Sequence, residues 1–218
     1  MKKLFLSSSF ADVSKLLPDF AKDELKGKRV TFIPTASIPE KVKFYVRTGK
    51  KALEKLGLII DELEITIATS EEISNKLRNN DYIYISGGNN FFLLQELKRT
   101  GADKIIIEQI NSGKLYIGES AGSIILSPNI EYTKDADDCE KAPDLDNNLA
   151  LGVINIYPLP HFKNFPFKKI VDKIISKYES NLELYPISNH QAILVQGNSV
   201  KVVSKPSFFQ RLWNNKNV

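Results

Sequence analysis

The chain has 218 residues, of which 42% are hydrophobic and 26% are charged, which suits one globular domain over residues 1–218 with a sizeable buried core. Its 30 basic and 26 acidic residues leave a formal net charge of only +4, a surplus that solvated lysines explain better than a nucleic-acid-binding surface does. Its one cysteine, Cys139, excludes an intrachain disulfide and a cysteine metal cluster.

The N-terminal apolar run Leu4-Phe5-Leu6 is too short for the core of a signal peptide. No apolar stretch of the sequence approaches the length that crosses a membrane. The single cysteine fits a reducing compartment. We therefore expect a soluble cytoplasmic protein, a monomer or a homodimer, with neither a membrane nor a nucleic acid as its partner.

Apolar periodicity predicts alternating strands and helices through the first half of the chain. In order we expect a strand at 4–7, helical spacing at 11–25 that Pro18 interrupts, a strand at 29–33, a long helix at 38–56, one or two strands within 58–67, a short helix at 70–77, a strand at 81–85 and a helix beginning at 91. Ser37 and Glu40 have capping-box spacing at the start of the long helix, and Gly57 is its expected end. Ser70 is the expected N-cap of the next helix.

The second half continues this alternation around one irregular segment. We expect a helix at 102–110, a strand at 114–117, a helix beyond residue 120, a polar acidic loop at 130–148, a strand at 151–157, a helix at 165–178 and closing strands at 182–187, 192–195 and 200–203, the last two joined as a hairpin at Gly197-Asn198. Residues 208–218 show no assignable pattern. Strands that alternate with helices predict a single α/β domain with a mostly parallel sheet flanked by helices.

A Gly-x-Ser-x-Gly motif, Gly118-Glu119-Ser120-Ala121-Gly122, stands where the strand at 114–117 passes into a helix. Small residues two positions either side of the serine let strand and helix approach closely, and the helix N-terminus directs free N–H groups toward the serine. Ser120 is therefore the candidate nucleophile, and the N–H of Ala121 is a candidate donor to an oxyanion. The same pattern also occurs by chance in proteins that make no catalytic use of it.

Another strand, glycine turn and helix precede this motif, with the turn at Ser86-Gly87-Gly88-Asn89-Asn90. Paired glycines at such a turn can expose backbone N–H groups to an anion or an oxyanion. The alternative, which the sequence leaves open, is that Gly87 and Gly88 only form a tight turn.

A serine nucleophile needs a base, and the chain offers His161 and His190. His161 follows a predicted strand in a stiff Pro-x-Pro-His loop, at the kind of strand end where an open α/β sheet places its ligands, which makes it the first choice. The base needs an orienting group, for which the candidates are Asp135 in the acidic loop and Asn189 beside His190. Asn189 can orient an imidazole but lacks the charge that stabilises imidazolium, and exchanging acid for amide in a serine triad can cost roughly 10⁴ in turnover.

The acidic loop carries its carboxylates without the spacing of a calcium-binding loop. Loops of this length in compact domains are often functional, although a solvated acidic loop is the simpler interpretation. We expect neither a metal ion nor another cofactor.

Three motifs follow one another along the chain: Ser86-Gly87-Gly88-Asn89, then Gly118-Glu119-Ser120-Ala121-Gly122, then Pro160-His161-Phe162. In this order and spacing the chain resembles the dipeptidase E family of serine peptidases, to which cyanophycinases are more distantly related. The resemblance extends from the first strand to the final hairpin. It implies a fold like the class I glutamine amidotransferase domain rather than the α/β-hydrolase fold.

Matched by position, the resemblance implies that Ser120 is the nucleophile and His161 is the base. It also implies that Gly88 and Ala121 supply the backbone donors to the oxyanion.

Four other positions are matched less directly. Asn89 and Glu119 flank the oxyanion donors, and we expect them either to contact substrate or to have a structural role. The family's acidic triad member falls before the strand at 192–195, where this chain has Asn189, or His190 if the alignment slips by one. Asp135 matches a further acidic position that the resemblance marks as catalytic or substrate-binding, so it is a substitute orienter.

A departure from the family concerns specificity. Members that cleave after an N-terminal aspartate carry an arginine shortly after the histidine, whereas this chain offers only lysines there, at Lys163, Lys168 and Lys169. Strict specificity for aspartate is therefore not expected.

These observations predict a serine-type peptidase that hydrolyses small peptides without a metal ion or cofactor. The first alternative is a weakly active or non-catalytic relative that binds a small peptide or metabolite, which Asn189 favours. The second is an esterase of α/β-hydrolase type, although the chain lacks a His-Gly-Gly oxyanion motif. The third is a structural or nucleic-acid-binding module, for which a basic stripe with interleaved aromatic residues is missing.

Overall fold

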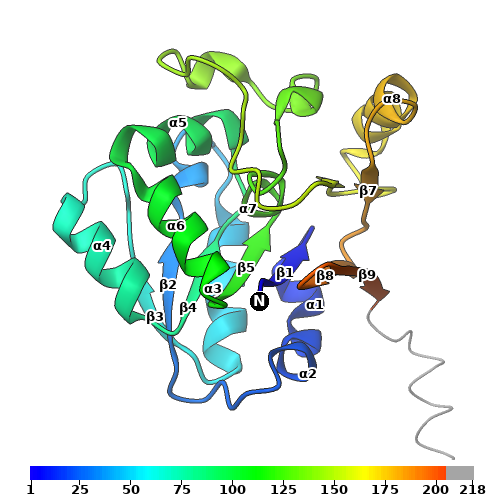
Figure 1. The fold of residues 1–218 in the computed structure, drawn as a ribbon. Coiled ribbons are helices and arrows are strands. Elements are labelled where there is room, and N and C mark those ends of the chain that lie inside the picture. The colour runs from blue at the N-terminus through cyan, green and yellow to red at the C-terminus, as the bar shows by residue number, and fades with distance from the viewer. Residues whose placement is uncertain (205–218) are drawn as a thin grey trace, which may run out of the picture.

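Seven strands form one sheet at the centre of the molecule (Figure 1). The computed structural model describes residues 1–204. The strands lie in the order β3-β2-β4-β5-β1-β8-β9, and their bounds are β1 Lys3–Ser7, β2 Arg29–Ile33, β3 Ile59–Glu62, β4 Tyr82–Ile85, β5 Leu115–Glu119, β8 Gln191–Gln196 and β9 Ser199–Ser204. The first five are parallel to one another, whereas β8 and β9 form an antiparallel hairpin at the edge beside β1. The predicted mostly parallel sheet and its final hairpin are confirmed.

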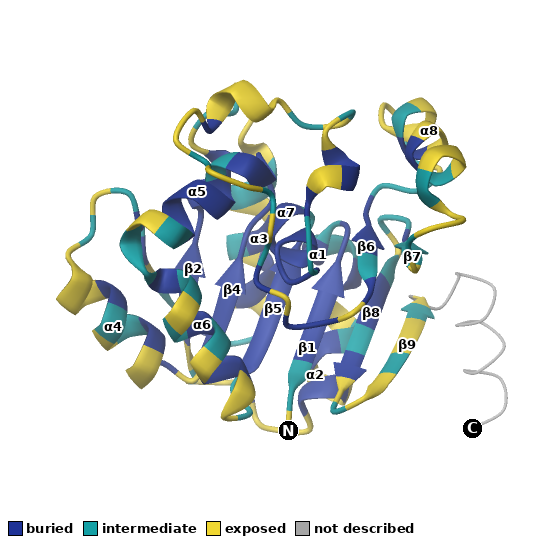
Figure 2. Cartoon of the chain, turned by 45° about the horizontal axis from the view of Figure 1, so that its top comes forward, coloured by how far each residue is buried: buried dark blue, intermediate teal, exposed yellow. Residues whose placement is uncertain are grey.

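Helices cover both faces of this sheet, because successive side chains of a strand point to opposite faces. Phe5 and Tyr84 face a core cluster shared with the helices α1 (Phe10–Val13), α2 (Leu17–Ala21) and α3 (Phe44–Lys55). Leu6 and Ile85 face the opposite cluster, shared with α4 (Ser70–Asn79), α5 (Asn90–Thr100), α6 (Ala102–Asn111) and α7 (Ala121–Ile124). Figure 2 shows buried central strands between helices whose outer faces are exposed. Burial of both faces explains why the central strands read as apolar runs rather than as alternating ones.

Two short strands form a separate parallel sheet beside the main one. They are β6 (Tyr157–Leu159) and β7 (Leu184–Pro186), and α8 (Lys168–Tyr178) lies between them in the chain. The expected closing strand at 182–187 therefore pairs outside the main sheet.

The predicted strand at 151–157 is wrong except at its last residue. Val153, Ile154 and Ile156 are buried, but they reach the core from an irregular segment. Local hydrogen bonds hold this segment, such as the one from the Leu151 N–H to the Ile125 carbonyl at 3.0 Å. The apolar residues of this segment do not form a strand, because no neighbouring strand pairs with them.

The predicted caps of two helices are wrong. The helix expected from residue 38 begins only at Phe44, and a separate short 3₁₀ helix at Thr35–Ser37 precedes it. The Ser37–Glu40 capping box is consequently not formed. For α4 the N-cap is Thr69 rather than Ser70, since the Thr69 hydroxyl accepts the Glu72 N–H at 3.1 Å.

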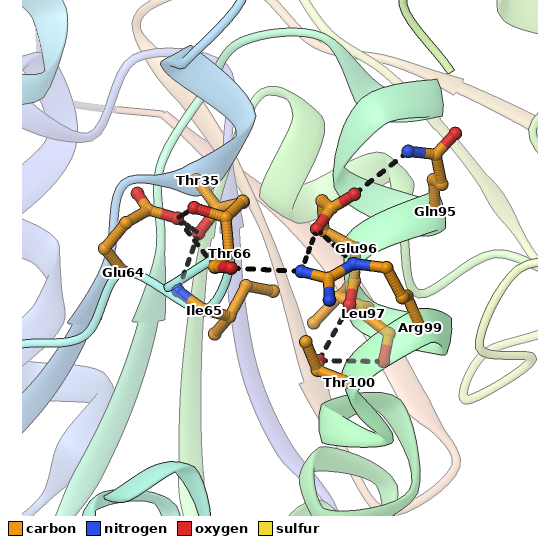
Figure 3. Close-up of polar contacts among 9 residues, drawn as sticks. All are labelled: Thr35, Glu64, Ile65, Thr66, Gln95, Glu96, Leu97, Arg99 and Thr100. Carbon is orange, nitrogen blue, oxygen red and sulfur yellow. Dashed lines mark hydrogen bonds and ion pairs between the residues drawn. The ribbon is translucent and has the colours of Figure 1, made fainter. Parts of the chain in front are cut away.

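Polar contacts fasten α5 to the loops at one side of the sheet (Figure 3). The Arg99 guanidinium donates to the Thr66 carbonyl at 3.1 Å and pairs with the buried Glu96 carboxylate at 2.6 Å. Glu64 in turn accepts the Thr35 hydroxyl at 2.8 Å. These contacts join the C-terminal half of α5 to the loop after β3, and that loop to Thr35.

Within residues 1–204, no helix has the length and apolar character needed to cross a membrane. The segment at 208–218 for which the sequence gives no assignment lies outside the described residues.

Candidate active site

The carboxyl ends of three neighbouring parallel strands meet at one edge of the sheet. β5 pairs with β1 on one side and with β4 on the other, so the loops that leave these strands begin side by side. Those loops carry Ser8, the turn at Gly87-Gly88, and Ser120. This is the edge where open α/β sheets bind their ligands.

Ser120 stands at a sharp, strained turn between β5 and α7. Its φ of 48° and ψ of −107° are unusual for a residue with a side chain, and its N–H donates to the Ser7 carbonyl at 2.9 Å. A Cβ on Gly118 would lie 2.6 Å from the Gly122 carbonyl oxygen, and a Cβ on Gly122 would overlap the Ile85 carbonyl. The two glycines therefore allow the close approach of strand, helix and neighbouring strand that this turn requires.

His161 reaches the same edge from the end of β6. Its Nε2 lies 3.1 Å from Ser120 Oγ, and its ring stacks on Phe167 with centroids 4.4 Å apart. Burial lowers the pKa of His161 below its ordinary value of 6.5, and the hydrogen bond with Asn189 only partly opposes this effect. The imidazole is therefore neutral at neutral pH, which is the form that accepts a proton.

The other ring nitrogen of His161 faces two side chains. Its Nδ1 lies 3.0 Å from Asn189 Oδ1 and 3.1 Å from Ser8 Oγ. Asn189 arrives here because β6 and β7 are parallel and end side by side, so that the residues following them emerge together. Ser120, His161 and Asn189 thus form a continuous series of hydrogen-bonding groups.

Two backbone N–H groups border Ser120. Gly88 has a φ of 138°, and a Cβ there would overlap the Ala36 carbonyl, which accepts the Asn89 N–H at 2.8 Å. Ala121 is the first residue of α7, where a helix has no internal acceptor for its N–H. Within residues 1–204, neither the Gly88 N–H nor the Ala121 N–H donates to a protein acceptor. Both are therefore available to an oxyanion.

Asn89 and Glu119, the two residues flanking these donors, are buried, with exposed fractions of 1% and 4%. The Asn89 amide accepts the Phe92 N–H and donates to the Asp138 carbonyl, both at 2.9 Å. The Glu119 carboxylate accepts the Phe10 N–H at 2.8 Å and the Tyr84 hydroxyl at 2.6 Å. Of the two roles that the sequence allows, this geometry favours the structural one over contact with substrate.

Glu119 should make the stability of the protein depend on pH. Burial raises its pKa to about 7, although the Tyr84 hydroxyl and the N–H groups of Phe10 and Gly87 act in the opposite direction. A carboxyl group whose pKa rises on folding contributes its full stability below the unfolded pKa, and that stability is lost as pH rises through the folded value.

Between pH 5 and pH 8, the free energy of unfolding of the wild type should therefore fall by about 2 kcal/mol more than that of Glu119→Gln. Urea denaturation of both proteins at each pH measures the difference. An identical pH dependence for the two proteins would contradict a raised pKa at this position.

Asp135 and His190, the substitute orienter and the second-choice base, lie elsewhere. The Asp135 carboxylate pairs with Lys173 at 2.9 Å and with Lys177 at 3.3 Å, both on α8, and these lysines lower its pKa. Among the described residues, the partners of the His161 ring are Ser8, Ser120 and Asn189, so Asp135 does not orient it. His190 is exposed.

Most carboxylates of the acidic loop are exposed, as expected of a solvated loop, but one part of the loop packs on the N-terminus of α5. Asp137 accepts the Asn90 N–H at 2.9 Å, and the neighbouring carbonyl of Asp138 accepts the Asn89 amide. Burial raises the pKa of Asp137 to about 6. Within residues 1–204, no three His, Cys, Asp or Glu side chains gather closely enough to hold a metal ion.

Comparison with known proteins supplies the family. Residues 4–203 match the model of Peptidase family S51. The chain belongs to this family. The expected relationship to dipeptidase E is confirmed, and with it the broad class of a peptidase.

Among relatives of this S51 peptidase, an uncharacterized peptidase from Listeria monocytogenes is 56% identical over 200 residues, which cover 92% of this chain and 97% of the relative. A peptidase E from Salmonella arizonae is 31% identical over 172 residues, covering 75% of this chain and 70% of the relative. The crystal structure of a candidate peptidase E from Listeria monocytogenes superimposes with a TM-score of 0.90 at 55% identity, covering 94% of this chain and 99% of that one.

Two residues of the candidate site, Ser8 and Phe167, were not predicted from the sequence. Ser8 belongs to the polar run Ser7-Ser8-Ser9 that directly follows a buried strand, and that position was the available signal. Nothing in the sequence distinguishes Phe167 from other apolar residues near a helix start, so its stacking on His161 could not be predicted.

Proposed function

We propose that this S51 family member is a serine-type peptidase that hydrolyses small peptides. The observation that carries the proposal is the 3.1 Å separation between Ser120 Oγ and His161 Nε2, at a serine held in strained backbone geometry. A nucleophile within reach of a base that a third group orients is the arrangement used for acyl transfer. The small size of the substrate is what the resemblance to the dipeptidase E family implies.

The proposed reaction has two halves. Ser120 Oγ attacks the scissile carbonyl carbon while His161 Nε2 takes the hydroxyl proton, and the N–H groups of Gly88 and Ala121 stabilise the oxyanion by on the order of 3 kcal/mol for each donor. The C–N bond then breaks as His161 returns the proton to the leaving amine, which leaves an acyl ester on Ser120. Water, deprotonated by the same nitrogen, hydrolyses the ester and restores the serine.

Asn189 occupies the position of the acid in this mechanism. Its amide oxygen, 3.0 Å from His161 Nδ1, accepts a hydrogen bond from the N–H there and holds the ring with Nε2 toward Ser120. An amide has no net charge with which to stabilise imidazolium. We therefore expect turnover slower than that of the same site with a carboxylate.

Labelling with a fluorophosphonate tests the proposal. The reagent should attach rapidly to intact wild-type protein at the peptide that contains Ser120, as read by mass spectrometry, and Ser120→Ala should remain unlabelled. A dipeptide library then defines the substrate. A folded wild type that is not labelled would refute the proposal and favour a protein that binds a small peptide or metabolite, the alternative to which the uncharged Asn189 points.

The pH dependence of this labelling should follow His161. Because burial holds the pKa of the imidazole below 6.5, its neutral form persists into mildly acidic solution, and the labelling rate should fall with a midpoint below pH 6.5. Asn189→Asp puts a negative charge beside Nδ1, which should raise the midpoint and increase the plateau rate about tenfold. A wild-type midpoint above 6.5, or no shift in the variant, would count against His161 as the base.

A further inference from the structure

We propose that Ser8 is a positioning residue that selects the tautomer of His161, by fixing which atom of the Asn189 amide faces the ring. The proposal rests on the function proposed above, in which Nε2 of His161 must be free to accept the Ser120 proton. Ser8 is the first residue after β1, and only 1% of it is exposed. Its hydroxyl has few partners to choose from, so its hydrogen bonds can be traced one by one.

The Ser8 hydroxyl has one proton to donate, and the surrounding distances indicate which atom accepts it. Its oxygen accepts the backbone N–H of His161 at 2.8 Å. Its proton points to Asn189 Oδ1, also at 2.8 Å. The amide oxygen of Asn189 therefore receives two hydrogen bonds, one from Ser8 and one from the ring at 3.0 Å. A shared oxygen acceptor means that Nδ1 carries the proton and that Nε2 presents its lone pair to Ser120.

The opposite orientation of Asn189 would break this arrangement. With the amide nitrogen facing inward, Asn189 would donate to both Ser8 Oγ and His161 Nδ1. Two lone pairs, one on Ser8 Oγ and one on Nδ1 at 3.1 Å from it, would then face three protons, the two of the amide and the one of the Ser8 hydroxyl, so one donor would lack an acceptor. An unsatisfied buried donor disfavours that orientation by about tenfold or more in population.

Fixing the orientation of the Asn189 amide compensates for one disadvantage of an amide at the position of the triad acid. A carboxylate offers an oxygen in either orientation, whereas an amide offers oxygen in only one of two. The wrong choice puts the proton on Nε2, and this error accounts for much of the roughly 10⁴-fold loss in serine triads that exchange acid for amide. Ser8 removes the ambiguity by adding a second donor, so that every proton of the cluster finds an acceptor only when the amide oxygen faces inward.

Nitrogen NMR of the histidines tests the inference without a substrate. The chain has only two histidines, so a long-range proton–nitrogen spectrum is simple, and His190→Gln assigns it. In wild type at pH above 7, His161 should be protonated at Nδ1. In Ser8→Ala we expect a mixture with at least about a tenth of the molecules protonated at Nε2. Ser9→Ala is the matched control, because the Ser9 hydroxyl makes no hydrogen bond within residues 1–204 and its removal should leave the spectrum unchanged.

Labelling rates supply a second readout. Ser8→Ala should slow fluorophosphonate labelling of Ser120 by at least about tenfold when residue 189 is asparagine. The same change in an Asn189→Asp background should slow it much less, because a carboxylate needs no help in presenting oxygen. A purely structural contribution of Ser8, such as its bond to the His161 backbone N–H, would lower both rates by the same factor.

The outcomes separate this inference from the proposed function. Suppose that the wild type is labelled at Ser120. An unchanged His161 tautomer in Ser8→Ala, or equal rate losses in the two backgrounds, would then overturn only the proposed role of Ser8. Wild type that does not label would overturn the peptidase mechanism itself. Should Ser8→Ala not fold, Ser8→Cys takes its place, because a thiol is a weak donor of similar shape, and the same mixture of tautomers is expected.

Discussion

His161→Ala is expected to lower kcat for peptide hydrolysis by about 10⁶-fold, the scale seen when the base of a serine triad is removed. The reason is geometric, since Ser120 Oγ has His161 Nε2 as its only nearby base within residues 1–204, at 3.1 Å. Without it the serine proton has no acceptor as the oxygen attacks. Steady-state kinetics on the best dipeptide from a library measures the loss.

The matched control is His190→Ala, which removes the other histidine from an exposed position and should leave kcat within about twofold of wild type. Binding of a non-hydrolysable dipeptide to His161→Ala should stay near the wild-type value, because the base acts on the serine rather than on the bound peptide. Substantial residual turnover in His161→Ala, or its loss in His190→Ala, would mean that the base has been misassigned.

Gly88→Ala is expected to lower kcat by about 10²- to 10³-fold, the cost of losing one oxyanion donor. At a φ of 138° a side chain is strained, and the new Cβ would overlap the Ala36 carbonyl. The turn must therefore shift, and it carries the N–H of Gly88 away from the oxyanion. Because the substrate carbonyl gains charge only in the transition state, KM should change little.

Gly101→Ala separates this effect from the general cost of a side chain in left-handed backbone. Gly101 has a φ of 74°, but a Cβ there meets nothing within 4 Å, and it lies at the far end of α5 from the turn. This variant should lose stability in urea denaturation while keeping its kcat. If the two variants lost kcat equally, the Gly88 N–H would not be a specific donor.

The sequence predicted the main sheet well, because its strands are apolar runs that end at glycine, proline or serine and alternate with periodic helices. It also pointed to Ser120 and His161, since each sits in a motif of fixed local geometry. Ser8 could not be found this way. Its contacts with His161 and Asn189 join residues more than 150 positions apart, and they depend on the pairing of β1 with β5 and on the small sheet.

The small sheet itself was beyond sequence reasoning for a physical reason. Strands of three residues, such as β6 and β7, are too short to show a period of two. The choice between Asp135 and Asn189 depended on tertiary packing, which brings Asn189 to His161 and Asp135 to two lysines of α8. Local patterns predict elements, but not which distant side chains meet between them.

The parallel pairing of β6 with β7 has a consequence for how this catalytic apparatus can change. The register of two short strands fixes the proposed base and its proposed orienter relative to each other, and the chain between them, including α8, leaves this small sheet and returns to it. Insertions or exchanges within that excursion would reshape the surface beside the imidazole without altering the spacing of the pair. An engineer could thus vary the exposed positions of residues 168–183 while the proposed proton-transfer pair stays in place, provided that Asn164 and Phe167, which contact Asn189 and His161, are kept.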